Sequence, residues 1–123
     1  MDDVAIINRD KAGRREVEDA LAAAGIRGRV DLVDGGQVES RVRAAINQGA
    51  RRVIVGGGDG TISSAAGALA GSPAALGLLP LGTLNHFARD LGIPFDLDEA
   101  AKVIATGTTR RVDIADVNGR PFV

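Results

Sequence analysis

Short apolar runs alternate regularly with amphipathic segments along most of the 123 residues, and this alternation most limits the possible folds. The apolar runs predict strands at residues 4–7, 29–33, 52–55 and 76–79. Apolar residues at helical spacing predict helices at residues 14–24, 37–48, 61–71, 83–91 and 98–105. Strands that alternate with helices favour a mainly parallel sheet with helices on both faces. We therefore expect a three-layer α/β/α domain.

The pattern changes after residue 109. Residues 110–117 alternate in period two, Asn118-Gly119 favours a type I′ hairpin turn, and residues 120–123 begin a return strand. A hairpin of this kind suggests the start of a β-rich domain, and a frayed hairpin at a natural terminus is the alternative. We expect residues 1–109 to form one domain and residues 110–123 to begin a truncated second one.

Composition excludes several classes of function. The net charge is −1, from 15 basic and 16 acidic residues, so nothing favours a nucleic-acid partner. Trp and Tyr are absent, which removes the usual stacking platforms for single strands, and the absence of Cys excludes disulfides and thiolate metal sites. No apolar run reaches the ~20 residues of a membrane span. We expect a cytoplasmic protein, with reversible contact at the inner face of the membrane and a homodimer left open.

The most informative stretch is the loop Gly56-Gly57-Gly58-Asp59-Gly60-Thr61, which joins a predicted strand to a predicted helix. Glycine has no Cβ, so this backbone can take positive φ and approach a ligand closely. Backbone N–H groups at a helix N-terminus attract phosphate. Thr61 is expected either to cap the helix or to donate its hydroxyl to a phosphate oxygen.

Asp59 makes this loop more specific. A carboxylate among anion-binding glycines repels phosphate unless a cation intervenes, and Mg²⁺ bridging to the phosphates is the natural cation. The alternative is a tight strand-to-helix turn in which Asp59 is the N-cap. Three consecutive glycines followed by Asp-Gly-Thr favour the phosphate interpretation.

The glycine loop lacks both the Lys-Ser/Thr ending of a Walker A loop and the G-x-G-x-x-G spacing of a dinucleotide fold. It resembles the Gly-Gly-Asp-Gly-Thr signature of the superfamily that contains diacylglycerol kinases, sphingosine kinases, NAD kinases and phosphofructokinases. These enzymes move phosphate from a nucleotide to a hydroxyl.

A second motif distinguishes the members of that superfamily. Residues 80–89 read Pro-Leu-Gly-Thr-Leu-Asn-His-Phe-Ala-Arg. They match every fixed position of the Pro-x-Gly-Thr-x-Asn-x-Phe-Ala-Arg segment of diacylglycerol and sphingoid-base kinases, whereas NAD kinases differ here. His86 departs from the acidic residue often found in the family, and we interpret it as an exposed polar residue. From Val4 to Val123, the chain resembles the nucleotide-binding domain of a bacterial lipid kinase.

The residues of the second motif have their own physical interpretations. Gly82-Thr83 is predicted to open a helix at the carboxyl end of a strand, a second place for a phosphate contact. Asn85 can donate and accept, which suits a nucleotide edge or an ordered loop. Arg89 is either a phosphate-neutralising residue or a solvated surface arginine.

The first loop matches the family less well. After its first strand the family carries Asn-Pro-x-Ser-Gly, and here Asn8 matches, Arg9 replaces the proline, and Ala12-Gly13 follows with one extra residue of spacing. Arg14 and Arg15 lie at a predicted helix start, where cations oppose the helix dipole. A bound anion would relieve that conflict, and two solvated arginines are the alternative.

The resemblance implies a phosphofructokinase-like fold and transfer of the ATP γ-phosphate to a lipid hydroxyl such as that of diacylglycerol, with Mg²⁺ screening the phosphates. It assigns the phosphate cradle to Gly57, Gly58, Asp59, Gly60, Thr61, Ile62 and Ser63. Asp59 would be the catalytic residue and metal ligand. The remaining nucleotide-lining residues would be Asn8, Gly82, Thr83 and Asn85.

Family members complete the site with a β-sandwich domain that binds lipid and carries a Gly-Leu-Asp segment, whose aspartate is the proposed general base. The 123 residues contain no such segment. The resemblance therefore implies that the lipid acceptor binds through a missing C-terminal domain and that the isolated domain is inactive. Two other classes stay open: an NAD kinase or sugar kinase relative, and a non-catalytic nucleotide-binding module.

Overall fold

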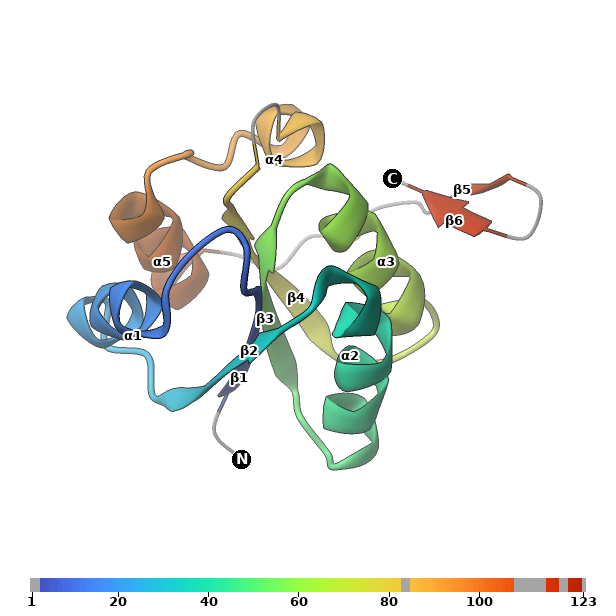
Figure 1. Cartoon of the computed structure of the whole chain (residues 1–123), viewed down its shortest axis with the longest axis horizontal. Helices are drawn as coiled ribbons and strands as arrows, with labels where there is room; N and C mark the ends of the chain where they lie inside the picture. The colour runs from blue at the N-terminus through green and yellow to red at the C-terminus, as the bar shows by residue number, and fades with distance from the viewer. Residues whose placement is uncertain (1–2, 83–84, 108–114, 118–119, 123) are drawn as a thin grey trace.

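The computed structural model describes residues 3–82, 85–107, 115–117 and 120–122. Four parallel strands form a sheet between two layers of helices (Figure 1). In chain order the strands are β1 (Asp3–Asn8), β2 (Gly28–Val33), β3 (Arg52–Gly57) and β4 (Ala75–Pro80). Their spatial order is β2-β1-β3-β4. The expectation of a three-layer α/β/α domain is confirmed.

The helices cover both faces of this sheet. On one face α1 (Arg14–Ala23) packs beside α5 (Leu97–Thr106), and on the other α2 (Val38–Asn47) packs beside α3 (Asp59–Leu69) (Figure 1). A short 3-10 helix, η1 (Gly35–Gln37), precedes α2. The short helix α4 (His86–Leu91), of six residues, follows the carboxyl end of β4.

Two apolar clusters, one on each side of the sheet, hold the layers together. Along β1, Val4 and Ile6 belong to the cluster under α2 and α3, whereas Ala5 and Ile7 belong to the cluster under α1 and α5. This alternation follows from the period-two geometry of a strand. Strands buried on both faces must be apolar along their whole length, which explains the continuous apolar runs of the sequence.

The predicted element boundaries are correct at most helix ends and wrong at two helix starts. Gly25 and Gly49 adopt φ of +80° and +93° just after α1 and α2, as helix-terminating glycines do. However, α3 begins at Asp59 rather than near Thr61. Helix α4 begins at His86 rather than at Thr83, because Asn85, its N-cap, is left-handed and its side chain bonds to the Gly82 backbone.

The predicted change to antiparallel pairing is confirmed at the end of the chain. Strand β5 (Ala115–Val117) pairs antiparallel with β6 (Arg120–Phe122) in a sheet separate from the four-stranded one. The predicted Asn118-Gly119 turn lies outside the described residues. So does the expected division between residues 109 and 110, because residues 108–114 are also outside them.

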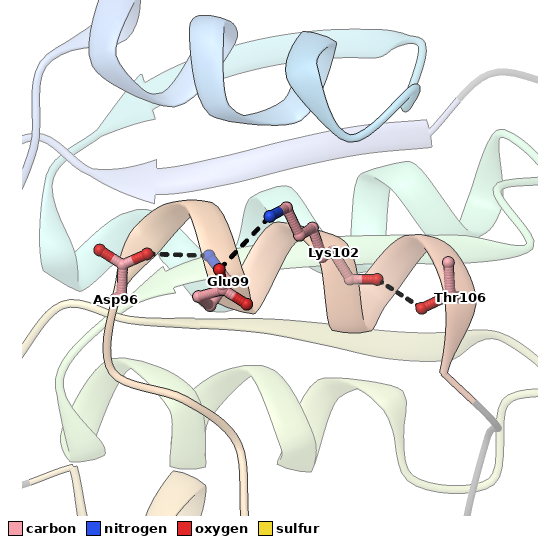
Figure 2. Close-up of polar contacts among 4 residues, drawn as sticks. All are labelled: Asp96, Glu99, Lys102 and Thr106. Atoms are coloured by element: carbon pink, nitrogen blue, oxygen red, sulfur yellow. Dashed lines mark hydrogen bonds and ion pairs between the residues drawn. The ribbon is translucent and has the colours of Figure 1, made fainter.

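Helix α5 is fixed by polar contacts at each turn (Figure 2). The side chain of Asp96, the N-cap residue, accepts a hydrogen bond from the Glu99 backbone N–H at 3.0 Å. Lys102 forms an ion pair with Glu99 at 3.3 Å, and the Thr106 hydroxyl donates to the Lys102 carbonyl at 2.8 Å. Because the ion pair is exposed, the cap is the larger contribution to stability.

We expect Asp96→Ala to lower the free energy of unfolding by about 1 kcal/mol, because it leaves a backbone donor of the first turn without its cap. Urea denaturation of the chain followed by circular dichroism measures this loss. The matched control is Asp98→Ala, which removes a carboxylate from the same turn without removing the cap. Equal losses in the two variants would contradict the role of the cap.

Candidate functional site

The glycine loop lies at the point of the sheet where the helices that follow neighbouring strands go to opposite faces. The helix that follows β1 covers one face of the sheet and the helix that follows β3 covers the other, although the two strands are neighbours. Ile7 pairs with Gly56, so both strands end at the same edge. In open parallel sheets this switch point at the carboxyl edge is the usual place for a ligand.

Asn8 links the end of β1 to the first turn of α3 across this switch point. Its side-chain Nδ2 lies 3.5 Å from the Thr61 hydroxyl, at the outer limit of a hydrogen bond, and its Oδ1 accepts from the Asp10 N–H at 3.0 Å. Both Asn8 and Thr61 are half-buried. The structure therefore brings together a predicted nucleotide-lining residue from β1 and one from the glycine loop.

The glycines of the loop are needed for close contact and not for unusual backbone angles. The expectation of positive φ in the loop is wrong: none of its glycines adopts positive φ, and Gly58 is extended, with φ −87° and ψ −171°. A Cβ on Gly57 would lie 2.7 Å from the Thr61 side chain, and one on Gly82 would lie 2.5 Å from the Gly58 Cα. Real Cβ atoms almost never approach other heavy atoms so closely.

Helix α3 presents its N-terminus at this edge. Gly58 is its N-cap and Asp59 its first residue, so neither Asp59 nor Thr61 is the N-cap. Asp59 is half-buried and lies in the first turn, where the positive end of the helix dipole favours a carboxylate. The same end of a helix favours phosphate, because the N–H groups of the first turn have no acceptor within the helix.

The other residues of the predicted phosphate cradle differ in how far they are buried. Gly60 is exposed and Ser63 is half-buried, whereas the Ile62 side chain is fully buried. The Ile62 N–H already donates to the Gly58 carbonyl at 3.0 Å. Ile62 thus anchors the first turn of α3 to the core.

The second motif folds directly onto the glycine loop. Gly57 pairs with Pro80 at the end of the sheet, and the Leu81 N–H donates to the Gly57 carbonyl at 2.9 Å. Gly82 then reaches the Gly58 backbone. Thr83 lies outside the described residues. The two glycine-containing motifs, more than 20 residues apart in the sequence, therefore form one surface.

Asn85 adopts one of the two arrangements expected for it, an ordered loop, and only the exact contacts were not predicted. Its side chain forms two hydrogen bonds with the backbone of Gly82, as acceptor at 2.9 Å and as donor at 2.8 Å. It is 4% exposed and has φ +50°. Asparagine tolerates this left-handed conformation better than other non-glycine residues, so a Gly-x-x-Asn spacing after a strand was the available signal.

Two basic residues between β1 and the first turn of α1 contact β2 or the residue that follows it. Arg9 forms an ion pair with Asp34 at 3.1 Å and donates to the Leu32 carbonyl at 3.1 Å. Arg14 donates to the Val30 carbonyl, and Arg15 is exposed. Farther along, the Arg89 guanidinium lies over the exposed Phe95 ring, 5.7 Å from its centroid. Both Arg14 and Arg89 thus have protein partners.

Asp59 is suited to hold a magnesium ion together with a nucleotide. Among the described residues, no group of three or more His, Asp or Glu side chains could hold a metal ion by itself. Mg²⁺ usually takes one or two carboxylates and completes its shell with phosphate oxygens and water. A single carboxylate beside the predicted phosphate cradle meets that requirement. In the described part of the chain, no helix is long and apolar enough to cross a membrane.

Known proteins resemble this chain in sequence and in fold. The chain is 38% identical over 124 residues to the "Probable lipid kinase YegS-like" of Pseudomonas aeruginosa, covering 96% of this chain and 41% of the relative. It is 46% identical over 91 residues to the protein of the same name from Cronobacter sakazakii, covering 71% of this chain and 30% of the relative. The chain thus spans less than half the length of these relatives.

A crystal structure of a diacylglycerol kinase from Bacillus anthracis superposes with a TM-score of 0.83 at 30% identity. The superposition covers 98% of this chain and 45% of that one. The sequence profile of the diacylglycerol kinase catalytic domain matches residues 6–117, which include both glycine motifs and Asn8. The chain therefore belongs to the diacylglycerol kinase catalytic domain family, a family of lipid kinases.

Proposed function

We propose that this chain is the ATP-binding part of a bacterial lipid kinase that transfers the γ-phosphate of ATP to a lipid hydroxyl such as that of diacylglycerol. The observation that carries the proposal is the convergence of Asn8, the N-terminus of α3 and Gly82 at one switch point. Membership in a kinase family supports ATP as the phosphate donor.

Each part of the site has a distinct task in this proposal. The backbone from Gly57 to Thr61, with Ser63 in the next turn, receives the phosphates, because glycines let the chain approach and the helix dipole favours negative charge. Asn8 and the loop at Gly82 and Thr83 line the nucleotide. Mg²⁺ bound with ATP neutralises charge on the phosphates. Asp59 holds that ion at the start of α3 and orients the phosphate that is transferred.

The acceptor requires residues outside this chain. Phosphoryl transfer depends on holding the attacking hydroxyl in line with the γ-phosphate. The relatives are more than twice as long as the matched region, which leaves room for a lipid-binding part and for the general base. We propose a cytoplasmic enzyme whose longer form makes reversible contact with the inner face of the membrane, where its lipid acceptor lies.

Asp59→Asn is expected to lower the affinity for ATP by about tenfold in Mg²⁺, because the substitution removes the charge that holds the ion. In EDTA it should leave the affinity unchanged or raise it, because the carboxylate then only repels the phosphates. Calorimetric titration of the chain with ATP under both conditions measures this. Asp19→Asn, on the exposed side of α1, is the matched control and should behave as the wild type. Equal metal dependence in Asp59→Asn and wild type would contradict the role of Asp59.

Residues 1–123 alone are expected not to phosphorylate diacylglycerol, whereas a polypeptide extended to the length of the relatives should do so. The reason is that this proposal assigns the acceptor site and the general base to residues outside this chain. Radiolabelled ATP with diacylglycerol in micelles provides the assay. Turnover by residues 1–123 would contradict the need for further residues. An inactive longer polypeptide would instead favour a nucleotide-binding module without catalysis.

A further inference from the structure

Asn85 combines three properties that a nucleotide ligand does not need. It has φ +50°, and among the described residues it is the one non-glycine residue with positive φ. Its side chain is 4% exposed. Both of its polar atoms already bond to Gly82, Oδ1 to the N–H and Nδ2 to the carbonyl. A strained backbone persists only where its surroundings hold it, and such residues concentrate at functional sites.

The two hydrogen bonds close a small ring between Gly82 and Asn85. The side-chain amide acts here as a second peptide group, because it offers one acceptor and one donor to the same residue. The ring fixes both the direction of the Gly82 backbone and the start of α4, where the Arg89 N–H donates to the Asn85 carbonyl at 2.9 Å. Asn85 therefore ties the Gly82 backbone to the start of α4.

The backbone of Leu81 and Gly82 in turn packs against the glycine loop. The Leu81 N–H bonds to the Gly57 carbonyl, and the Gly82 backbone lies so close to Gly58 that a Cβ on Gly82 would be 2.5 Å from the Gly58 Cα. The same Cβ would lie 3.0 Å from the Asn85 Oδ1. The orientation of the peptide groups at Gly57 and Gly58 thus depends on where Asn85 holds Gly82.

We propose that Asn85 is a positioning residue and not a nucleotide ligand: its amide holds Gly82 against Gly58 and so keeps the phosphate cradle in its binding shape before ATP arrives. The proposal rests on the proposed function, because it assumes that the glycine loop receives phosphate. Preorganised donors bind a charged group more tightly, since none of the binding energy is used to arrange them.

The informative variant is Asn85→Gly. Glycine adopts positive φ more readily than asparagine, so this variant permits the same backbone conformation while removing the two side-chain hydrogen bonds. We expect about tenfold weaker binding of ATP with Mg²⁺ by calorimetry. We also expect faster hydrogen exchange of the Gly82 amide in the nucleotide-free chain, measured by NMR. Asn85→Asp keeps the acceptor but places a carboxylate oxygen against the Gly82 carbonyl in place of the donor, so it should also weaken ATP binding and speed Gly82 exchange.

Asn47→Gly, at the exposed end of α2, is the matched control and should change neither quantity. Wild-type ATP affinity in Asn85→Gly would overturn the proposal, since Asn85 would then serve only the left-handed backbone. Weaker binding with unchanged Gly82 exchange would also overturn it, because that pair of results indicates a direct nucleotide contact. Should Asn85→Gly fail to fold, unchanged ATP affinity and Gly82 exchange in Asn85→Asp would overturn it equally.

The two measurements separate this proposal from the proposed function. A wild-type chain that does not bind ATP would contradict the nucleotide site itself. The Gly82 amide exchange, recorded without nucleotide, would still show whether Asn85 holds the loop. Protection of Gly82 that is lost in Asn85→Gly supports the positioning role, and protection that is retained contradicts it.

Discussion

The approach of the Gly82 backbone to the Gly58 backbone is the contact on which the rest of the site depends. It is possible only because the parallel register of β3 and β4 ends both strands at one edge, where Gly57 pairs with Pro80. A side chain at residue 82 would collide with main-chain atoms, which cannot move away as a flexible side chain can. The sheet therefore brings the two motifs together, and the missing Cβ atoms let them touch.

This contact lies beside the positive end of α3, which gives the site its electrostatic character. The first turn of the helix attracts anions, and it carries the Asp59 carboxylate at the same end. A phosphate and a carboxylate can share that place when a divalent cation lies between them. The same local geometry thus supports both the proposed phosphate cradle and the proposed metal ligand. The Asn8 side chain, from the neighbouring strand, borders them.

The layered fold could be predicted because strands buried on both faces leave continuous apolar runs, such as Val53 to Val55. The clustering of Asn8 with the glycine loop was also predictable, since parallel strands share a carboxyl edge. The start of α4 was not, because the Asn85 side chain bonds to the Gly82 backbone, and such bonds leave no periodic pattern in the sequence. The reason for the glycines at 58 and 82 was not predicted either, because local backbone preferences do not indicate which distant residues come into contact.

The central claim, that ATP binds by its phosphates at the N-terminus of α3, is tested most directly by NMR. The nitrogen-15-labelled chain is titrated with ATP and Mg²⁺, and the amide shifts are followed residue by residue. We predict that the largest changes fall on residues 57–63 and on Gly82, with little change at the far ends of the strands, near Gly28 and Arg52. Changes concentrated at those far ends, or no saturable change in residues 57–63, would contradict the claim.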